Sequence, residues 1–274
     1  MPAIGLFVLL AAAILLPKGS EGALRMASPD RTRVDQMRSL VAGLDKGAFV
    51  LVDFDPDIGT YPEIRGAVRA LFDDLAARDA SVAVVSFTPE GRALAVAELA
   101  RLERLRAAGA GILQPLDLGF VAGSEAGLVR AVEIMVPASA SGPIADSVRA
   151  GGGGIGAFAL AVIVSGGDLG ARSWVEQVGP RLPDLPMAAI APTFLEPELA
   201  PYLRSGQLRA LLATLREGTA YAESVPGGDA PRDRPIAPLP MLVGMLVALG
   251  ALAAAAFAGA AGQMSPPAAP ERGA

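Results

Sequence analysis

Two apolar segments lie near the ends of this 274-residue chain and restrict what it can fold into. The first covers residues 3–16 and the second covers residues 239–262, and neither contains a charged side chain. A helix rises about 1.5 Å per residue, so the second segment is long enough to cross a hydrocarbon core of about 30 Å. We therefore predict a transmembrane helix over 239–262 and a water-exposed domain between the two segments.

The first segment has two interpretations, because it is short for a membrane span. Residues 1–17 form either an uncleaved hydrophobic anchor or a secretory signal that is removed. Basic residues are more numerous next to the domain than beyond the second segment, which favours a cytoplasmic domain. A signal-like start favours the other side of the membrane. The predicted location is the cell membrane, with the side of the soluble domain undecided.

The composition excludes several classes of chemistry, since the chain contains no cysteine and no histidine. Disulfides, Cys or Ser–His nucleophile pairs, and His-ligated zinc, iron or copper sites are impossible. A net charge of −5 and the lack of a basic tract argue against a nucleic-acid partner. The lysines are Lys18 and Lys46, so carboxylates, hydroxyls, arginine, backbone dipoles or an oxygen-bound cation must carry any chemistry.

Short apolar runs alternate with amphipathic stretches between residues 29 and 225. Such runs are typical of strands buried on both faces of a parallel sheet, and apolar residues at helical spacing predict the helices that cover it. The pattern predicts a mostly parallel, Rossmann-like three-layer α/β domain over 29–225, then a Pro-rich tether at 226–238 and a disordered tail at 263–274. The predicted strands are 48–54, 81–87, 112–116, 158–164 and 187–191; the predicted helices are 31–44, 62–78, 89–108, 124–135, 171–178, 196–203 and 205–223, with a Gly-rich loop at 137–154.

Polar side chains stand at the ends of several predicted strands. Asp53, Asp55 and Asp57 lie at the end of the first strand, and Ser86 and Thr88 lie at the end of the second. Ligands of parallel sheets gather at the carboxyl ends of the strands, so these side chains would bind a divalent cation or a phosphorylated ligand. The alternative is that they terminate strands and cap the following helices. Further candidates at the same edge are Ser165, Asp168 and Thr193.

The runs Val-Asp-Phe-Asp at 52–55 and Val-Ser-Phe-Thr at 85–88 resemble the pattern of haloacid-dehalogenase phosphatases. The chain departs from that pattern, because no lysine that would hold the phosphoryl group follows Lys46. The resemblance implies a magnesium-dependent phosphohydrolase, in which Asp53 is the nucleophile, Asp55 the general acid, Ser86 a phosphate ligand, and Asp53, Asp55 and Asp168 surround the magnesium.

A second resemblance covers most of residues 48–223. The motifs that carry it are Val-Asp-Phe-Asp-Pro at 52–56, Thr-Pro-Glu-Gly at 88–91, Gly-Ser-Glu-Ala-Gly at 123–127, Trp-Val-Glu-Gln-Val at 174–178 and Ser-Gly-Gln-Leu at 205–208. In these motifs the chain is similar to an uncharacterised bacterial family of membrane-anchored α/β proteins, and this similarity implies one coherent domain without implying any activity.

These observations lead to three hypotheses about function. The first is a membrane-anchored binding or complex-assembly module that is not an enzyme and needs no cofactor. The second is the magnesium-dependent phosphohydrolase, and the third is a sensor whose strand-edge carboxylates bind a cation or nucleotide without turnover. The candidate ligand-binding residues at that edge are Ser86, Thr88 and Asp168. The expected partners are the lipid bilayer and a second helix that packs on the 239–262 helix. That packing would use small residues on one helix face: Gly244, Ala248, Ala251, Ala255 and Gly259.

Overall fold

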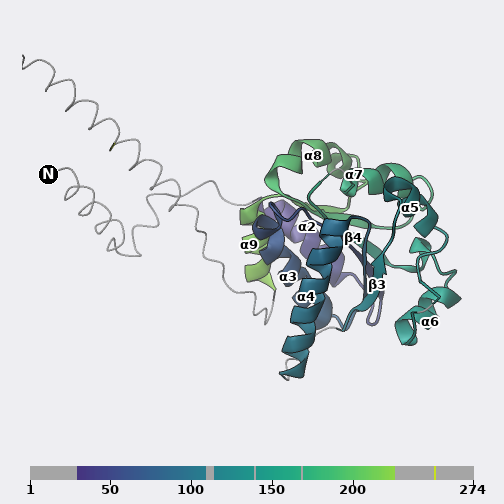
Figure 1. Cartoon of the computed structure of the whole chain (residues 1–274). Coiled ribbons are helices and arrows are strands. Elements are labelled where there is room, and N and C mark those ends of the chain that lie inside the picture. The colour runs from purple at the N-terminus through teal and green to yellow at the C-terminus, as the bar shows by residue number, and fades with distance from the viewer. Residues whose placement is uncertain (1–29, 109–113, 139, 168, 226–249, 251–274) are drawn as a thin grey trace, which may run out of the picture. The chain divides into compact units, whose positions relative to one another are not determined.

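A parallel sheet of six strands organises the α/β domain (Figure 1). The computed structural model describes residues 30–108, 114–138, 140–167, 169–225 and 250. Every pair of neighbouring strands is parallel, and the strand order is β3-β2-β1-β4-β5-β6. The strands are β1 (Phe49–Asp55), β2 (Ser81–Ser86), β3 (Leu116–Phe120), β4 (Leu160–Ser165), β5 (Met187–Ile190) and β6 (Ala210–Leu212).

Helices cover both faces of the sheet, which makes three layers. Alternate residues of β1 point to opposite faces, so Val50, Val52 and Phe54 join one core and Leu51 joins the other. The first core is completed by α2 (Arg31–Ala42), α3 (Tyr61–Ala77), α4 (Pro89–Ala107) and α9 (Leu215–Ser224). The second contains α5 (Ser124–Ala131), α6 (Pro143–Ala150), η2 (Ile155–Ala157), α7 (Ala171–Ser173), η3 (Trp174–Val178) and α8 (Glu196–Arg204), and η4 (Thr193–Leu195) precedes α8.

The predicted Rossmann-like parallel α/β class is confirmed, and so is the first helix cap. Asp30 precedes α2, and its Oδ1 accepts a hydrogen bond of 2.9 Å from the backbone N–H of Thr32. Thr88 and Thr214 cap α4 and α9 in the same way. The helices α2, α4 and α9 therefore begin where a short polar side chain accepts a hydrogen bond from a free backbone N–H of the first turn.

Three predicted elements were wrong. The strand predicted at 112–116 lies at 116–120, because Pro115 has no N–H to donate and pairing starts after it. Residues 210–212, predicted as helix, form β6, which is too short to show a pattern and follows a turn at Gly206 with φ of +79°. The loop predicted at 137–154 contains α6.

The predicted membrane segments are not part of this description. Residues 1–17, 226–238 and 263–274 lie outside the described residues, as does 239–262 apart from Gly250. Among the helices that are described, none combines the length and the apolar character needed to span a bilayer.

Candidate functional site

The strand order reverses between β1 and β4, which is where open α/β sheets usually bind ligands. Asp53 and Asp55 stand at the carboxyl end of β1 and point to the same face of the sheet as Leu51. In the register of the sheet, Asp53 lies beside Ile163 and Asp55 lies beside Ser165 of β4. The structure thus brings these two predicted residues together at the predicted edge, and we call them the carboxyl pair.

Asp53 is enclosed by the protein. Only 1% of its surface is exposed, and its Oδ2 accepts a hydrogen bond of 2.5 Å from the indole Nε1 of Trp174. Its Oδ1 is buried and has no hydrogen-bond donor from the described residues. Burial raises the pKa of Asp53 well above its ordinary value, and the charge of Asp55 and a hydrogen bond with Asp55 raise it further. Asp53 is therefore held as a buried group that resists ionisation.

Asp55 is hydrogen-bonded to the turn between β2 and α4. Its carboxylate accepts hydrogen bonds from the backbone N–H groups of Phe87 (2.7 Å) and Thr88 (2.9 Å) and from Thr88 Oγ1 (2.8 Å). Burial raises the pKa of Asp55, and these donors partly oppose that effect. The start of α4 comes so close that a Cβ on Gly91 would lie 2.3 Å from Asp55 Oδ1. A glycine is thus required at position 91, a signal that sequence reasoning missed.

The predicted ligand-binding hydroxyls have internal partners. Ser86 is fully buried, and its Oγ donates to the backbone carbonyl of Phe54 at 2.9 Å. Thr88 Oγ1 donates to Asp55 and accepts from the N–H of Gly91 at 3.1 Å. Asp168 lies outside the described residues. Within the residues that are described, no three acidic side chains gather in a way that would hold a metal ion.

The loops that follow β1 and β4 lie close together next to the carboxyl pair. A Cβ on Gly166 would lie 2.3 Å from the backbone nitrogen of Asp57, and a Cβ on Gly170 would lie 2.6 Å from Cβ of Ser165. Both contacts are closer than any side chain allows. At Gly166, the backbone of the loop after β1 therefore lies directly against the loop after β4.

A π-helical turn, η3, positions Trp174 at this site. The N–H of Gly179 donates to the carbonyl of Trp174 at 3.1 Å, which is the i→i+5 bond of a π turn. The indole packs edge-on against Phe87, with ring centroids 6.3 Å apart, and donates to Asp53. This contact could not be predicted from the sequence, because Trp174 and Asp53 are 121 residues apart.

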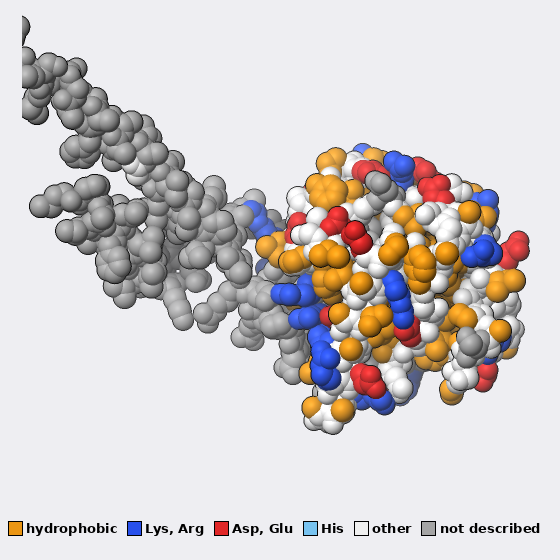
Figure 2. Space-filling model, in the orientation of Figure 1, with side chains coloured by type: hydrophobic (Ala, Val, Ile, Leu, Met, Phe, Trp, Pro, Cys, Tyr) orange, Lys and Arg blue, Asp and Glu red, His pale blue; other side chains and the backbone are white. Residues whose placement is uncertain are grey.

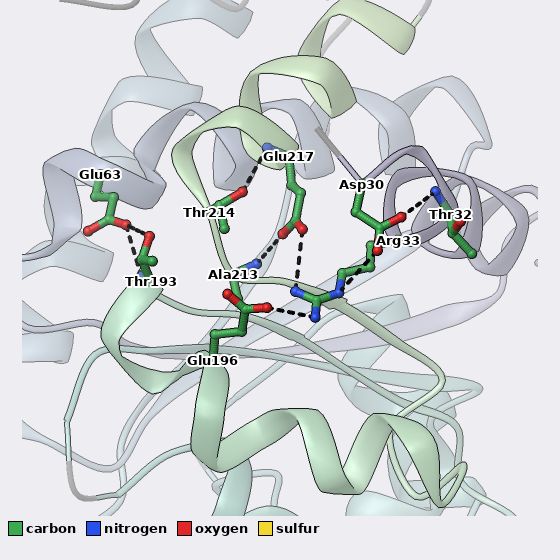
Figure 3. A network of polar contacts seen from close by, with 9 residues as sticks. All are labelled: Asp30, Thr32, Arg33, Glu63, Thr193, Glu196, Ala213, Thr214 and Glu217. Atoms are coloured by element: carbon green, nitrogen blue, oxygen red, sulfur yellow. Dashed lines mark hydrogen bonds and ion pairs between the residues drawn. The ribbon is translucent and has the colours of Figure 1, made fainter. Parts of the chain in front are cut away.

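A second polar network lies at the same edge of the sheet and joins four helices (Figure 3). The guanidinium of Arg33, from α2, contacts Glu196 of α8 at 2.8 Å and Glu217 of α9 at 3.3 Å. Beside it, Glu63 of α3 accepts a hydrogen bond of 2.9 Å from the backbone N–H of Thr193. Of these residues, sequence reasoning had marked Thr193 alone.

The surface over α4 mixes apolar, acidic and basic side chains without a field of one sign (Figure 2). A surface cavity of about 390 Å³ lies between α4 and β3, and the carboxyl pair does not line it. A bidentate ion pair between Arg92 and Asp117 (2.6 and 2.8 Å) contributes to its wall. The cavity is also lined by Val96, Leu99, Glu103, Arg106 and Gln114.

Comparison of the chain with protein-family models, curated proteins and solved structures found no match. The parallel, Rossmann-like α/β fold is therefore the narrowest class to which the observations assign the chain.

Proposed function

We propose that this chain is a membrane-anchored α/β module that binds or assembles with a partner and does not catalyse a reaction. The observation that carries the proposal is the environment of Asp53, which is 1% exposed and hydrogen-bonded to Trp174. A nucleophile has to come within about 3–3.5 Å of the atom it attacks. The protein that surrounds Asp53 keeps a substrate from coming this close, so Asp53 suits a structural role better than a catalytic one.

The alternative, a magnesium-dependent phosphohydrolase, requires more than a nucleophile. Phosphoryl transfer depends on positive groups that stabilise the charge of the transferred phosphoryl group. Lys46 precedes β1 at the opposite edge of the sheet and pairs with Asp79 at 2.8 Å. Asp55, the general acid of that mechanism, accepts three hydrogen bonds from the β2–α4 turn. These contacts favour the binding module.

Membrane anchoring rests on the sequence. The uncharged segment 239–262 has the length of a transmembrane helix, and the Pro-rich residues 226–238 would hold the domain away from the bilayer. The resemblance to the bacterial family of membrane-anchored α/β proteins supports the same arrangement. Packing of a second helix against 239–262 would supply the assembly function.

We expect the purified full-length chain, in a non-ionic detergent, to show no magnesium-dependent hydrolysis of p-nitrophenyl phosphate. Its melting temperature should also stay unchanged when magnesium and beryllofluoride are added together, since both side chains of the carboxyl pair are buried and hydrogen-bonded within the protein. Asp53→Asn is the control, because it removes the nucleophile and keeps the size of the side chain. Turnover that is present in the parent and absent in Asp53→Asn would establish the phosphohydrolase instead.

A further inference from the structure

The hydrogen bonds around the carboxyl pair indicate where a proton is held. Both oxygens of Asp55 accept hydrogen bonds from the β2–α4 turn, and Oδ2 of Asp53 accepts one from Trp174. Oδ1 of Asp53 is buried and meets no donor among the described residues. Two carboxyl groups can form a hydrogen bond with each other only when one of them is protonated, because an ionised carboxylate has no donor. The contacts therefore assign the proton to Asp53 Oδ1 and leave Asp55 as the ionised member of the pair.

A second negative charge at the carboxyl pair would find no cation to balance it among the described residues. The segments next to the pair are the loop after β1, the first turn of α4, and α5, α7 and η3, and their charged side chains are Asp57, Glu90, Arg92, Glu125, Arg130, Arg172 and Glu176. The three arginines make their contacts elsewhere, with an acid of β3, with a backbone carbonyl, and with acids of η3 and α8. The charge that acts on Asp53 is that of Asp55. Water is therefore the partner that an ionised Asp53 would require.

The π turn η3 covers Asp53 and is joined to the carboxyl pair by a single hydrogen bond. The β2–α4 turn donates three hydrogen bonds to Asp55, whereas η3 donates only through the indole of Trp174. Other polar contacts of η3 lie at the surface, where Glu176 accepts from Tyr202 Oη at 2.7 Å and lies 3.9 Å from Arg172. Turns of the π type are rare and often occur at functional sites. Of these two segments, η3 is thus the one that can move while the β2–α4 turn stays bound.

We propose that the carboxyl pair is a proton-operated switch, in which η3 closes over Asp53 while the proton is bound and moves away to admit water when the proton is lost. The proton passes from Asp53 Oδ1 to solvent and leaves two carboxylates, which repel each other and need hydration. The closed state lies on the acid side and the open state on the alkaline side. Because burial raises the pKa of Asp53, the change occurs above the range in which exposed aspartates titrate. The inference goes beyond the proposed function, since it holds whichever partner the module binds.

The test uses the fluorescence of Trp174, the single tryptophan of the chain, which is fully buried in the closed state. The full-length protein, in a non-ionic detergent without aromatic groups, is titrated from about pH 5 to about pH 9, below the titration of tyrosine and lysine. We expect the emission to shift to longer wavelength in one step and quenching by acrylamide to increase over the same pH range. The far-ultraviolet circular dichroism should stay constant. Emission that does not change with pH would overturn the inference, and so would loss of secondary structure in the same step.

Two variants show whether the carboxyl pair causes the step. Asp53→Asn should keep the emission of the closed state at every pH, because an amide can donate to Asp55 and accept from Trp174 but cannot ionise. Asp57→Asn is the matched control, since Asp57 follows the same strand and is exposed, and it should show the step at the same pH as the parent. A step that persists in Asp53→Asn, or disappears in Asp57→Asn, would assign the change to other groups and overturn the inference.

Infrared spectroscopy of the parent protein provides a measurement that does not depend on how a variant folds. A protonated carboxyl group has a C=O stretch that is distinct from the bands of a carboxylate. We expect one such stretch to persist above the pH at which exposed aspartates ionise and to disappear over the pH range of the Trp174 step. If no acid stretch persists there, or if its loss and the Trp174 step occur at different pH values, the carboxyl pair does not hold the proton that controls η3.

Discussion

Two buried serines, Ser86 and Ser165, end strands on either side of β1. Each is fully buried. Ser86 Oγ donates to the carbonyl of Phe54 at 2.9 Å, whereas Ser165 Oγ has no partner among the described residues. A buried hydroxyl contributes to stability only when its hydrogen bond offsets the free-energy cost of removing the hydroxyl from water. The two serines therefore allow the stability contribution of a buried hydroxyl to be compared with and without a hydrogen bond.

We expect Ser86→Ala to lower the free energy of unfolding by about 1 kcal/mol, the usual net value of one hydrogen bond. Ser165→Ala should leave it unchanged or raise it, because the substitution removes a hydroxyl that makes no bond. Urea denaturation of the full-length chain in detergent measures both values. A larger loss for Ser165→Ala than for Ser86→Ala would mean that the Ser165 hydroxyl has a partner that stabilises the fold.

The carboxyl pair makes the stability of the domain depend on pH. Burial raises the pKa of Asp53 in the folded protein above its ordinary value of 3.8, so the folded state holds this proton over a pH range in which the unfolded state has lost it. The free energy of unfolding should therefore fall as pH rises from about 4 towards the folded pKa. Asp53→Asn, which mimics the neutral acid, should flatten this dependence in thermal denaturation series. An unchanged slope would show that other groups cause it.

At the scale of elements, the Arg33 network connects the first helix of the domain to the last one. The side chain of Arg33 is 15% exposed and that of Glu217 is 4% exposed, so their contact is shielded from water. Glu217 also accepts a hydrogen bond of 2.9 Å from the N–H of Ala213, at the end of β6. A single guanidinium thus holds α2 against α8 and α9. Lys46 and Asp79, by contrast, form a pair in which both side chains are mostly exposed.

Arg33→Met should lower the free energy of unfolding by about 3 kcal/mol, because it leaves the buried carboxylate of Glu217 without its cation. Lys46→Met is the matched control and should leave the denaturation midpoint unchanged, since exposed ion pairs contribute little. Chemical denaturation of both variants measures the difference. Equal midpoints for the two variants would mean that Glu217 is satisfied by its backbone contact alone.

Local patterns explain which elements could be predicted. The strands β1, β2 and β4 consist mainly of apolar residues, and the apolar residues of α3 recur at helical spacing after Pro62. A short stretch of sequence is therefore enough to predict each of these elements. The strand β6 has three residues and no pattern of its own, and only its pairing with β5 makes it a strand. Propensity over 205–223 favoured a helix, and tertiary pairing overrode it.

The candidate site, too, could be predicted from the sequence only in part. The place of Asp53 and Asp55 at the end of a strand follows from the sequence, because alternation puts both on one face. Their contacts do not follow, since Trp174 lies 121 residues from Asp53 and Thr193 lies 130 residues from Glu63. Nothing in the sequence near these residues encodes such pairs, and only the packing of distant loops creates them.

At the scale of the whole molecule, the sequence predicts that the C-terminal apolar segment is the stronger anchor. We expect deletion of residues 238–274 to release the protein from membranes washed with carbonate, because segment 1–17 is short for a span. Deletion of 263–274 alone is the control and should leave the protein in the membrane pellet. If the longer deletion also stays in the pellet, residues 1–17 span the membrane.

The two edges of the sheet affect how the protein behaves when it is crowded. β6 has three residues and packs against α2. β3 pairs with β2 through a register shift at Val84/Val85, and Gly119 within it has a φ of +84°. Short or irregular edges are poor templates for an incoming strand. Many copies of the domain at high local concentration would therefore resist joining sheet to sheet, and intermolecular β-aggregation would be suppressed by the fold itself.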